Sequence, residues 1–320
     1  MSNVPSRSSR RSTPDASKLA EVRGRFTATL LAVLLCALAP AAQAQAAPPA
    51  AQLDFGGLQR TYYLHLPPGP PTGLVVNMHA AGQTGQQHAA LTHYDAVADA
   101  HGYVVVYPDG IDFSWADGRG ASVPDRTGVD DVGFLAALVD RLTAEYAIPP
   151  GRVFATGLSA GGFMANRLAC ERADMFAAIA PIGATLGDQV ACNPARPVSV
   201  LTSQGTVDPI VPFHGGPMVG RGGPSTILAA YAVVDRWREL NDCEPDPVIA
   251  PVPGSGDGTS AERVSYACAA GTEVVFLRVD GGGHTWPGAP EILPANQVGP
   301  ATRAFDASEV SAQFFDAHGR

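Results

Sequence analysis

One short segment constrains the fold of this chain more than any other. It reads Gly157-Leu158-Ser159-Ala160-Gly161-Gly162 and separates a predicted strand at 152–156 from a predicted helix that starts near 163. In such a tight turn, small residues two positions before and after the serine avoid steric clash, and the helix N-terminus faces a developing oxyanion. The context therefore predicts a nucleophile at Ser159, the alternative being a glycine-rich turn with an incidental serine.

Short apolar runs alternate with helical patterns along most of the chain. We predict strands at 60–66, 74–78, 103–107, 153–156, 177–182, 198–203 and 274–279. Helices are expected between them, with a final helix at 306–317. This alternation predicts an α/β protein of the α/β-hydrolase fold, with a mostly parallel central sheet, helices on both faces and no large lid.

A clear helical pattern runs from Asp131 to Tyr146, where apolar residues recur at helical spacing. Asp130 and Asp131 precede or begin this helix, and negative charge there favours the helix dipole. We interpret both as capping residues. A calcium site is the competing interpretation, but the ligand spacing of a known calcium loop is missing.

A serine hydroxyl needs a base to remove its proton, and in this fold the order along the chain is serine, acid, histidine. His284 lies in a glycine-rich loop directly after the predicted strand 274–279, so we predict it as the base. Asp208 follows the strand 198–203 and is the preferred acid. Asp280, which directly precedes the glycine loop, remains the rival.

The loop after the strand 74–78 is expected to supply one oxyanion donor. We nominate the backbone N–H groups of Ala160 and Ala81, with Ala80 as the alternative to Ala81. Trp286, Trp115 and His79 are the substrate-binding candidates, and His79 is also expected to support its loop. Substrate contacts are further expected from two Gly- and Pro-rich loops, 213–224 and 251–259.

The bulk composition limits the possible partners. The chain has 320 residues and a formal net charge of -9. No basic face is available for phosphates, so nucleic acid is excluded as a partner and a small, oligomeric or polymeric ester fits better. The cysteines and histidines lack the spacing of a zinc site, so we expect neither a metal nor a cofactor. We expect a monomer.

The first residues have the layout of a secretory signal: scattered cations, an apolar run from Phe26 to Ala39, and small residues around Ala44. We predict a signal peptide at 1–44, an Ala/Pro-rich linker at 45–51 and a catalytic domain at 52–320. The apolar run is too short for a stable membrane anchor. The mature protein is therefore expected to be extracellular or periplasmic.

Four cysteines remain after removal of the signal: Cys170, Cys192, Cys243 and Cys268. An even number in an exported chain favours disulfides. Proximity in sequence suggests pairing the first with the second and the third with the fourth, although three pairings are possible.

These motifs resemble secreted esterases of the poly(3-hydroxybutyrate) depolymerase family, which overlap with feruloyl and acetylxylan esterases of carbohydrate esterase family one. The resemblance extends from residues 60–67 to residues 283–288 and is most specific at 129–134, 157–164, Cys170-Glu171 and 208–212. It implies a triad of Ser159, Asp208 and His284, an oxyanion loop at 79–82, and the same two cysteine pairs. The family commonly has His-Gly where this chain has His79-Ala80, which weakens the assignment of the second donor.

We therefore predict a secreted serine esterase, a carboxylic ester hydrolase that forms an acyl-enzyme. Oligomers of 3-hydroxybutyrate or related hydroxyalkanoates are the preferred substrates, because no surface-binding module for solid polymer follows the catalytic region. A feruloyl or acetylxylan esterase is the alternative. A non-catalytic binding protein of hydrolase fold is the alternative of another class, but such proteins usually lose a member of the triad.

Overall fold

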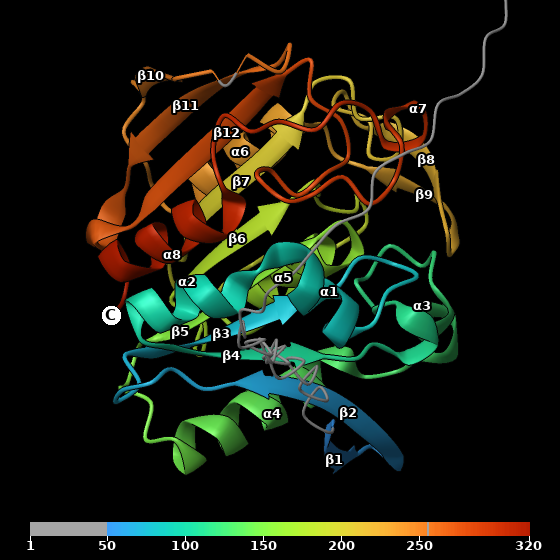
Figure 1. The fold of residues 1–320 in the computed structure, drawn as a ribbon, viewed down its shortest axis with the longest axis vertical. Helices are drawn as coiled ribbons and strands as arrows, with labels where there is room; N and C mark the ends of the chain where they lie inside the picture. Colours follow the sequence, from blue (N-terminus) through green and yellow to red (C-terminus); the bar gives the residue numbers. More distant parts are fainter. Residues whose placement is uncertain (1–49, 255) are drawn as a thin grey trace, which may run out of the picture. The chain divides into compact units, whose positions relative to one another are not determined.

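A computed structural model describes residues 50–254 and 256–320, and the predicted signal peptide lies outside them. Ten strands form one sheet in the order β1-β2-β4-β3-β5-β6-β7-β12-β11-β10 (Figure 1). Their bounds are β1 Ala51–Phe55, β2 Leu58–His65, β3 Gly73–Met78, β4 Tyr103–Pro108, β5 Val153–Leu158, β6 Ala178–Ile182, β7 Ser199–Gly205, β10 Val248–Val252, β11 Ser260–Ala267 and β12 Glu273–Asp280. A separate hairpin pairs β8 Gly216–Gly220 with β9 Gly223–Ile227.

The six central strands, from β4 to β12 in the sheet order, are mutually parallel. They are almost entirely buried, as expected for parallel strands covered on both faces. The outer strands at both edges pair antiparallel. The predicted α/β-hydrolase sheet is confirmed, and its antiparallel margins are an addition that the sequence did not reveal.

Helices cover both faces of the sheet. The larger ones are α1 Gly85–Thr92, α2 Tyr94–His101, α4 Asp131–Glu145, α5 Ala160–Glu171, α6 Ala230–Leu240 and α8 Ala307–Ala317; the short ones are α3 Val123–Thr127, α7 Ala295–Val298, η1 Ile111–Phe113 and η2 Ala269–Gly271. Val76 and Ala155 pack with α4, α5 and α6, whereas their neighbours Val75 and Phe154 pack with α2 and α8. Successive residues of a strand thus pack into two separate cores, one on each face of the sheet. Figure 1 shows α2 and α8 side by side on one face.

The two aspartates at the start of α4 have different roles. Asp130 caps the helix, since its carboxylate accepts a hydrogen bond from the Gly133 N–H at 2.8 Å. Asp131 is fully buried and bonds Arg60 of β2 at 2.7 Å and the Ala116 N–H at 2.7 Å. The interpretation of Asp131 as a cap was therefore wrong. It is half of a buried ion pair that joins β2, α4 and the loop before α3.

Two disulfides are formed, Cys170–Cys192 and Cys243–Cys268. The first attaches the end of α5 to the segment between β6 and β7, and the second joins the end of α6 to the end of β11. Of the three possible pairings, these are the ones that proximity in sequence suggested. Within the described residues, no helix is long and apolar enough to span a membrane.

Candidate active site

Three predicted side chains follow the carboxyl ends of parallel strands. Ser159 comes directly after β5, Asp208 follows β7 by three residues, and His284 follows β12 by four. Carboxyl ends of parallel strands meet at the same edge of the sheet, where open α/β sheets usually bind their ligands. The topology therefore brings together residues that are far apart in the sequence.

Ser159 has an unusual backbone conformation, with φ 56° and ψ -119°, between β5 and α5. Such a conformation is strained for a residue with a side chain and persists only when its surroundings fix it. The Ser159 N–H donates to the Ile182 carbonyl, and its own carbonyl accepts from the Phe163 N–H, both at 2.9 Å. A Cβ at Gly157 or Gly161 would lie 2.5 or 2.0 Å from the Met78 carbonyl oxygen. Glycine is thus required on both sides of the serine, because the turn packs directly on β3.

His284 and Asp208 form a buried pair. Nδ1 of His284 lies 2.8 Å from Oδ2 of Asp208, and the Asp208 side chain has no exposed surface. The other carboxylate oxygen accepts the N–H groups of Ile210 and Val211, each at 2.8 Å. Gln204 donates to Oδ2 at 3.1 Å. These bonds fix the carboxylate, and its bond to Nδ1 leaves Nε2 of the imidazole available to a neighbouring group.

Asp280, the rival acid, points elsewhere. Its carboxylate forms a two-pronged pair with Arg278, at 3.0 and 2.9 Å. The loops that carry Asp208 and His284 are joined by a hydrogen bond from the Val207 N–H to the Gly282 carbonyl at 3.0 Å. The geometry therefore links His284 to Asp208 and not to Asp280.

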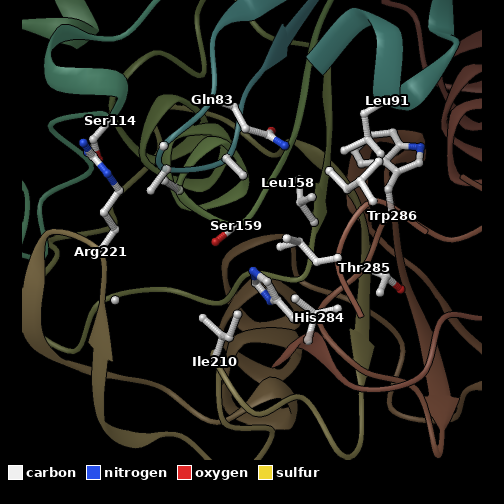
Figure 2. Close-up of a pocket in the computed structure, with 18 of the residues that line it drawn as sticks. Gln83, Leu91, Ser114, Leu158, Ser159, Ile210, Arg221, His284, Thr285 and Trp286 are labelled. Carbon is white, nitrogen blue, oxygen red and sulfur yellow. The ribbon is translucent and has the colours of Figure 1, made fainter. Parts of the chain in front are cut away.

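Ser159 and His284 both line a pocket of about 400 Å³. Figure 2 shows Ser159 between two kinds of wall. Leu91 and Trp286 lie on one side, and Ser114 and Arg221 lie on the other. The first side is apolar, and the second carries hydrogen-bond donors. Such a pocket suits an elongated ligand with chemically different ends.

The predicted oxyanion donors flank this pocket. Ala160 is the first residue of α5, where backbone N–H groups have no acceptor within the helix. Ala80 and Ala81 also line the pocket. Since both residues belong to the lining, the alternative between them stays open.

His79 and Trp115 do not line the pocket, which differs from their prediction as substrate-binding residues. Both are fully buried, and their rings lie 4.9 Å apart beneath the loop. The indole of Trp115 donates to the His79 carbonyl, and Nε2 of His79 accepts the Gly110 N–H, each at 2.9 Å. Burial lowers the pKa of His79, which keeps the ring neutral and able to accept. Both residues support the loop, as was also expected for His79.

Trp286 does line the pocket, next to His284. Its indole N–H donates to the Ser308 hydroxyl of α8 at 3.1 Å, which fixes the ring against the last helix. Of the two loops expected to supply contacts, 213–224 lines the pocket through Met218 and residues 220–223, whereas 251–259 does not.

Several contributors were missed from the sequence. Arg119, Gln83 and the segment 289–293 also line the pocket. The arginine precedes the nucleophile by forty positions in a loop without a recognisable motif, so only the folded chain brings it to the site. The one available signal for Arg119 was its spacing, two residues after Asp117. A carboxylate that becomes buried requires a partner, and Arg119 is near enough to be that partner.

Comparison with known proteins identifies the family. The profile described as Esterase PHB depolymerase matches residues 60–211. NocK of Nocardia uniformis subsp. tsuyamanensis, a protein that carries the name of an esterase, is 32% identical over 296 residues, which span 85% of this chain and 83% of that protein. The chain belongs to the esterase PHB depolymerase family. It is accordingly a carboxylic ester hydrolase.

Other proteins that resemble this member of the esterase PHB depolymerase family have narrower names. Feruloyl esterase B of Piromyces equi is 29% identical over 66% of this chain and 39% of its own length. Poly(3-hydroxyalkanoate) depolymerase C of Paucimonas lemoignei is 33% identical over 40% of this chain and 31% of its own length. An acetyl xylan esterase from Aspergillus awamori matches the fold with a TM-score of 0.55 at 16% identity, covering 84% of this chain and 100% of that one.

Proposed function

We propose that this protein is a secreted serine esterase that hydrolyses oligomers of 3-hydroxybutyrate or related hydroxyalkanoates. The observation that carries the mechanism is the buried hydrogen bond of 2.8 Å between Asp208 and His284, with His284 and Ser159 facing one pocket. Asp208 holds the tautomer with its proton on Nδ1, so Nε2 is the basic nitrogen.

The reaction follows from these positions. Nε2 of His284 takes the proton of the Ser159 hydroxyl as its oxygen attacks the ester carbonyl. The resulting oxyanion is held by the N–H of Ala160 and by that of Ala81 or Ala80. Collapse breaks the bond to the alcohol, which leaves with the proton from His284. Water, deprotonated by His284, then releases the acid and restores Ser159.

The substrate class rests on three supports. The family description and a relative named as a poly(3-hydroxyalkanoate) depolymerase favour a hydroxyacid ester. The apolar side of the pocket fits a short alkyl chain, and the donor side fits the oxygens of a neighbouring unit. The net charge of -9 disfavours a highly anionic substrate.

A second candidate is a feruloyl or acetylxylan esterase. It is favoured by Trp286, whose indole can pack against an aromatic acyl group. The match to the Piromyces feruloyl esterase also spans more of this chain, 66%, than the match to the depolymerase, 40%.

Turnover by the mature protein, with Ser159→Ala as control, tests both candidates. The panel contains 3-hydroxybutyrate oligomers, methyl ferulate, acetylated xylan and a short p-nitrophenyl ester. We expect the highest kcat/KM on the oligomers and its loss in the variant. A preference for ferulate or acetylxylan would reassign the substrate, and turnover that survives in the variant would remove Ser159 as nucleophile.

Export is tested separately. The two disulfides support an oxidising destination. We expect N-terminal sequencing of the protein from culture medium or periplasm to find cleavage after Ala44 or Ala46. Full-length protein retained in the cytoplasm would contradict export.

A further inference from the structure

Arg119 lines the pocket although its side chain is only 9% exposed. Its guanidinium donates two hydrogen bonds to the Asp117 carboxylate, with Nε 2.9 Å from Oδ1 and Nη2 2.7 Å from Oδ2. We call this two-pronged pair the fork. Asp117 is itself buried. The fork fixes the plane of the guanidinium, because two parallel hydrogen bonds leave it little freedom to turn.

A stacking contact fixes the same group from below. The guanidinium carbon lies 3.7 Å from the centre of the Phe163 ring. Phe163 is one turn along α5 from Ser159, since its N–H bonds the Ser159 carbonyl. One helical turn advances about 5.4 Å along the axis. Helix α5, which follows Ser159 directly, therefore also holds Arg119 close to this nucleophile.

One nitrogen of Arg119 lacks a strong acceptor among the described residues. Its Nη1 bonds only the sulfur of Met218, at 3.5 Å, and a thioether is a weak acceptor. Met218 belongs to the β8–β9 hairpin and also lines the pocket. A nearly buried arginine with an N–H left to a weak acceptor has a donor to offer to a bound ligand.

The charges around the pocket favour a neutral ligand group. Asp117 neutralises Arg119, and Arg221 lies 2.8 Å from the Asp112 carbonyl and 3.6 Å from its carboxylate. Glu291 adds a negative charge to the lining. The donor side thus offers directed N–H groups without excess positive charge, which suits a carbonyl oxygen better than a carboxylate.

We propose that Arg119 determines specificity by donating from Nη1 to a neutral carbonyl oxygen in the unit next to the scissile ester. This inference rests on the proposed function. In a 3-hydroxyacid polyester, successive carbonyls are separated by only a few chain atoms. A second carbonyl therefore lies within a short distance of the first, as Arg119 lies near Ser159. A monoester has nothing to place there.

A matched set of substrates tests this. Methyl 3-(butanoyloxy)butanoate carries a second carbonyl, its methyl ether analogue replaces that carbonyl with a methylene group, and its free acid carries a carboxylate. The measured quantity is the ratio of kcat/KM for release of butanoate from the diester to that for its release from the ether. We expect a ratio of about tenfold or more in the wild-type enzyme, since one hydrogen bond from a charged donor has this effect.

The test variant is Asp117→Asn/Arg119→Gln, which removes both charges and so leaves no unpaired carboxylate in the interior. Its ratio is expected to fall close to one. Met218→Leu removes the sulfur but keeps the fork and should retain the ratio. Thermal unfolding of each variant shows whether it is folded.

Several outcomes would overturn the proposal. An unchanged ratio in a folded Asp117→Asn/Arg119→Gln variant would give Arg119 a purely structural role. Equal rates on diester and ether in the wild type would show that no second carbonyl is recognised, and a preference for the free acid would replace neutral recognition by charge. Failure of the proposed function is distinct, since it appears as low wild-type turnover of all three compounds compared with methyl ferulate or acetylated xylan.

Discussion

At the scale of single residues, the two carboxylate oxygens of Asp208 serve different groups. Oδ2 of Asp208 faces His284, whereas Oδ1 holds the backbone of Ile210 and Val211. The carboxylate thus orients the imidazole and shapes its own loop at once. A change that separates these two tasks reveals which one matters for the reaction.

Asp208→Asn makes that separation. Asparagine keeps an oxygen for the two N–H groups but turns an amide nitrogen toward Nδ1, which favours the tautomer with its proton on Nε2. That tautomer cannot accept the Ser159 proton. We expect kcat to fall by a factor on the order of 10⁴, with KM little changed, in steady-state assays.

Asp280→Asn is the matched control, because Asp280 pairs with Arg278 at the protein surface. Its kcat should stay close to that of the wild type. A loss of less than tenfold in Asp208→Asn, or an equal loss in Asp280→Asn, would contradict the assignment of the acid.

At the scale of elements, the buried pair of Arg60 and Asp131 connects three parts of the fold. Nη2 of Arg60 bonds Asp131 and the Asp109 carbonyl, and its guanidinium carbon lies 3.8 Å from the centre of the Phe134 ring. Asp131 also holds the Ala116 N–H. The loop between β4 and α3, which carries Ser114 and Arg119 to the pocket, is thereby attached to the core.

Arg60→Met tests how much this attachment contributes to the stability of the fold. It leaves a buried carboxylate with only a backbone partner, so we expect the free energy of unfolding to fall by about 3 to 5 kcal/mol in urea titrations. The double variant Arg60→Met/Asp131→Asn removes the charge and should recover part of the loss. Equal stability of the single variant and the wild type would show that the pair contributes little.

At the scale of the whole molecule, stability depends on histidines that fold in their neutral form. His88 is fully buried, and its Nε2 lies 2.9 Å from the amide oxygen of Asn77. Burial, with a smaller contribution from nearby His79, lowers the pKa of His88 to about 3. An unfolded histidine has a pKa of about 6.5.

The unfolded chain therefore binds a proton at His88 between these two pH values, and the folded chain does not. Stability from this group is complete above pH 6.5 and is lost as the pH falls toward 3. Between pH 7 and 4.5, we expect the free energy of unfolding to fall by about 2 to 3 kcal/mol more in the wild type than in His88→Gln. Identical pH dependence in both, measured by urea titration, would contradict this.

The sequence predicted the central part of the fold and missed its margins, for physical reasons. The parallel strands are buried on both faces and appear as continuous apolar runs, and all six were predicted; the seventh predicted strand, at 60–66, corresponds to the antiparallel β2. The strands β1, β8, β9, β10 and β11 are short, exposed or interrupted, and β10 contains a proline. Their pairing depends on neighbours that a local pattern does not contain.

The residues of the site also divide into those that the sequence predicted and those that only the folded chain brings to the pocket. Ser159 was predicted from its motif between a predicted strand and a predicted helix, and Asp208 and His284 were predicted from chain order and their places after predicted strands. Arg119 and Gln83 line the pocket only because the loops around them fold over it. His79 and Trp115 were placed in the right loops, but hydrogen bonds beneath the surface turn them inward.

The β8–β9 hairpin pairs within its own two-stranded sheet, outside the sheet that carries the reacting groups. A bridge between Gly187 and Ile227 attaches the end of the hairpin. At its tip, Arg126 of α3 donates to the Gly222 carbonyl, and Arg221 donates to the Asp112 carbonyl. Diversification of this hairpin can therefore proceed with the reacting groups left in place. A library of residues 216–227 is where directed evolution should begin when a new ester is wanted, and natural divergence of ester preference is expected to concentrate there.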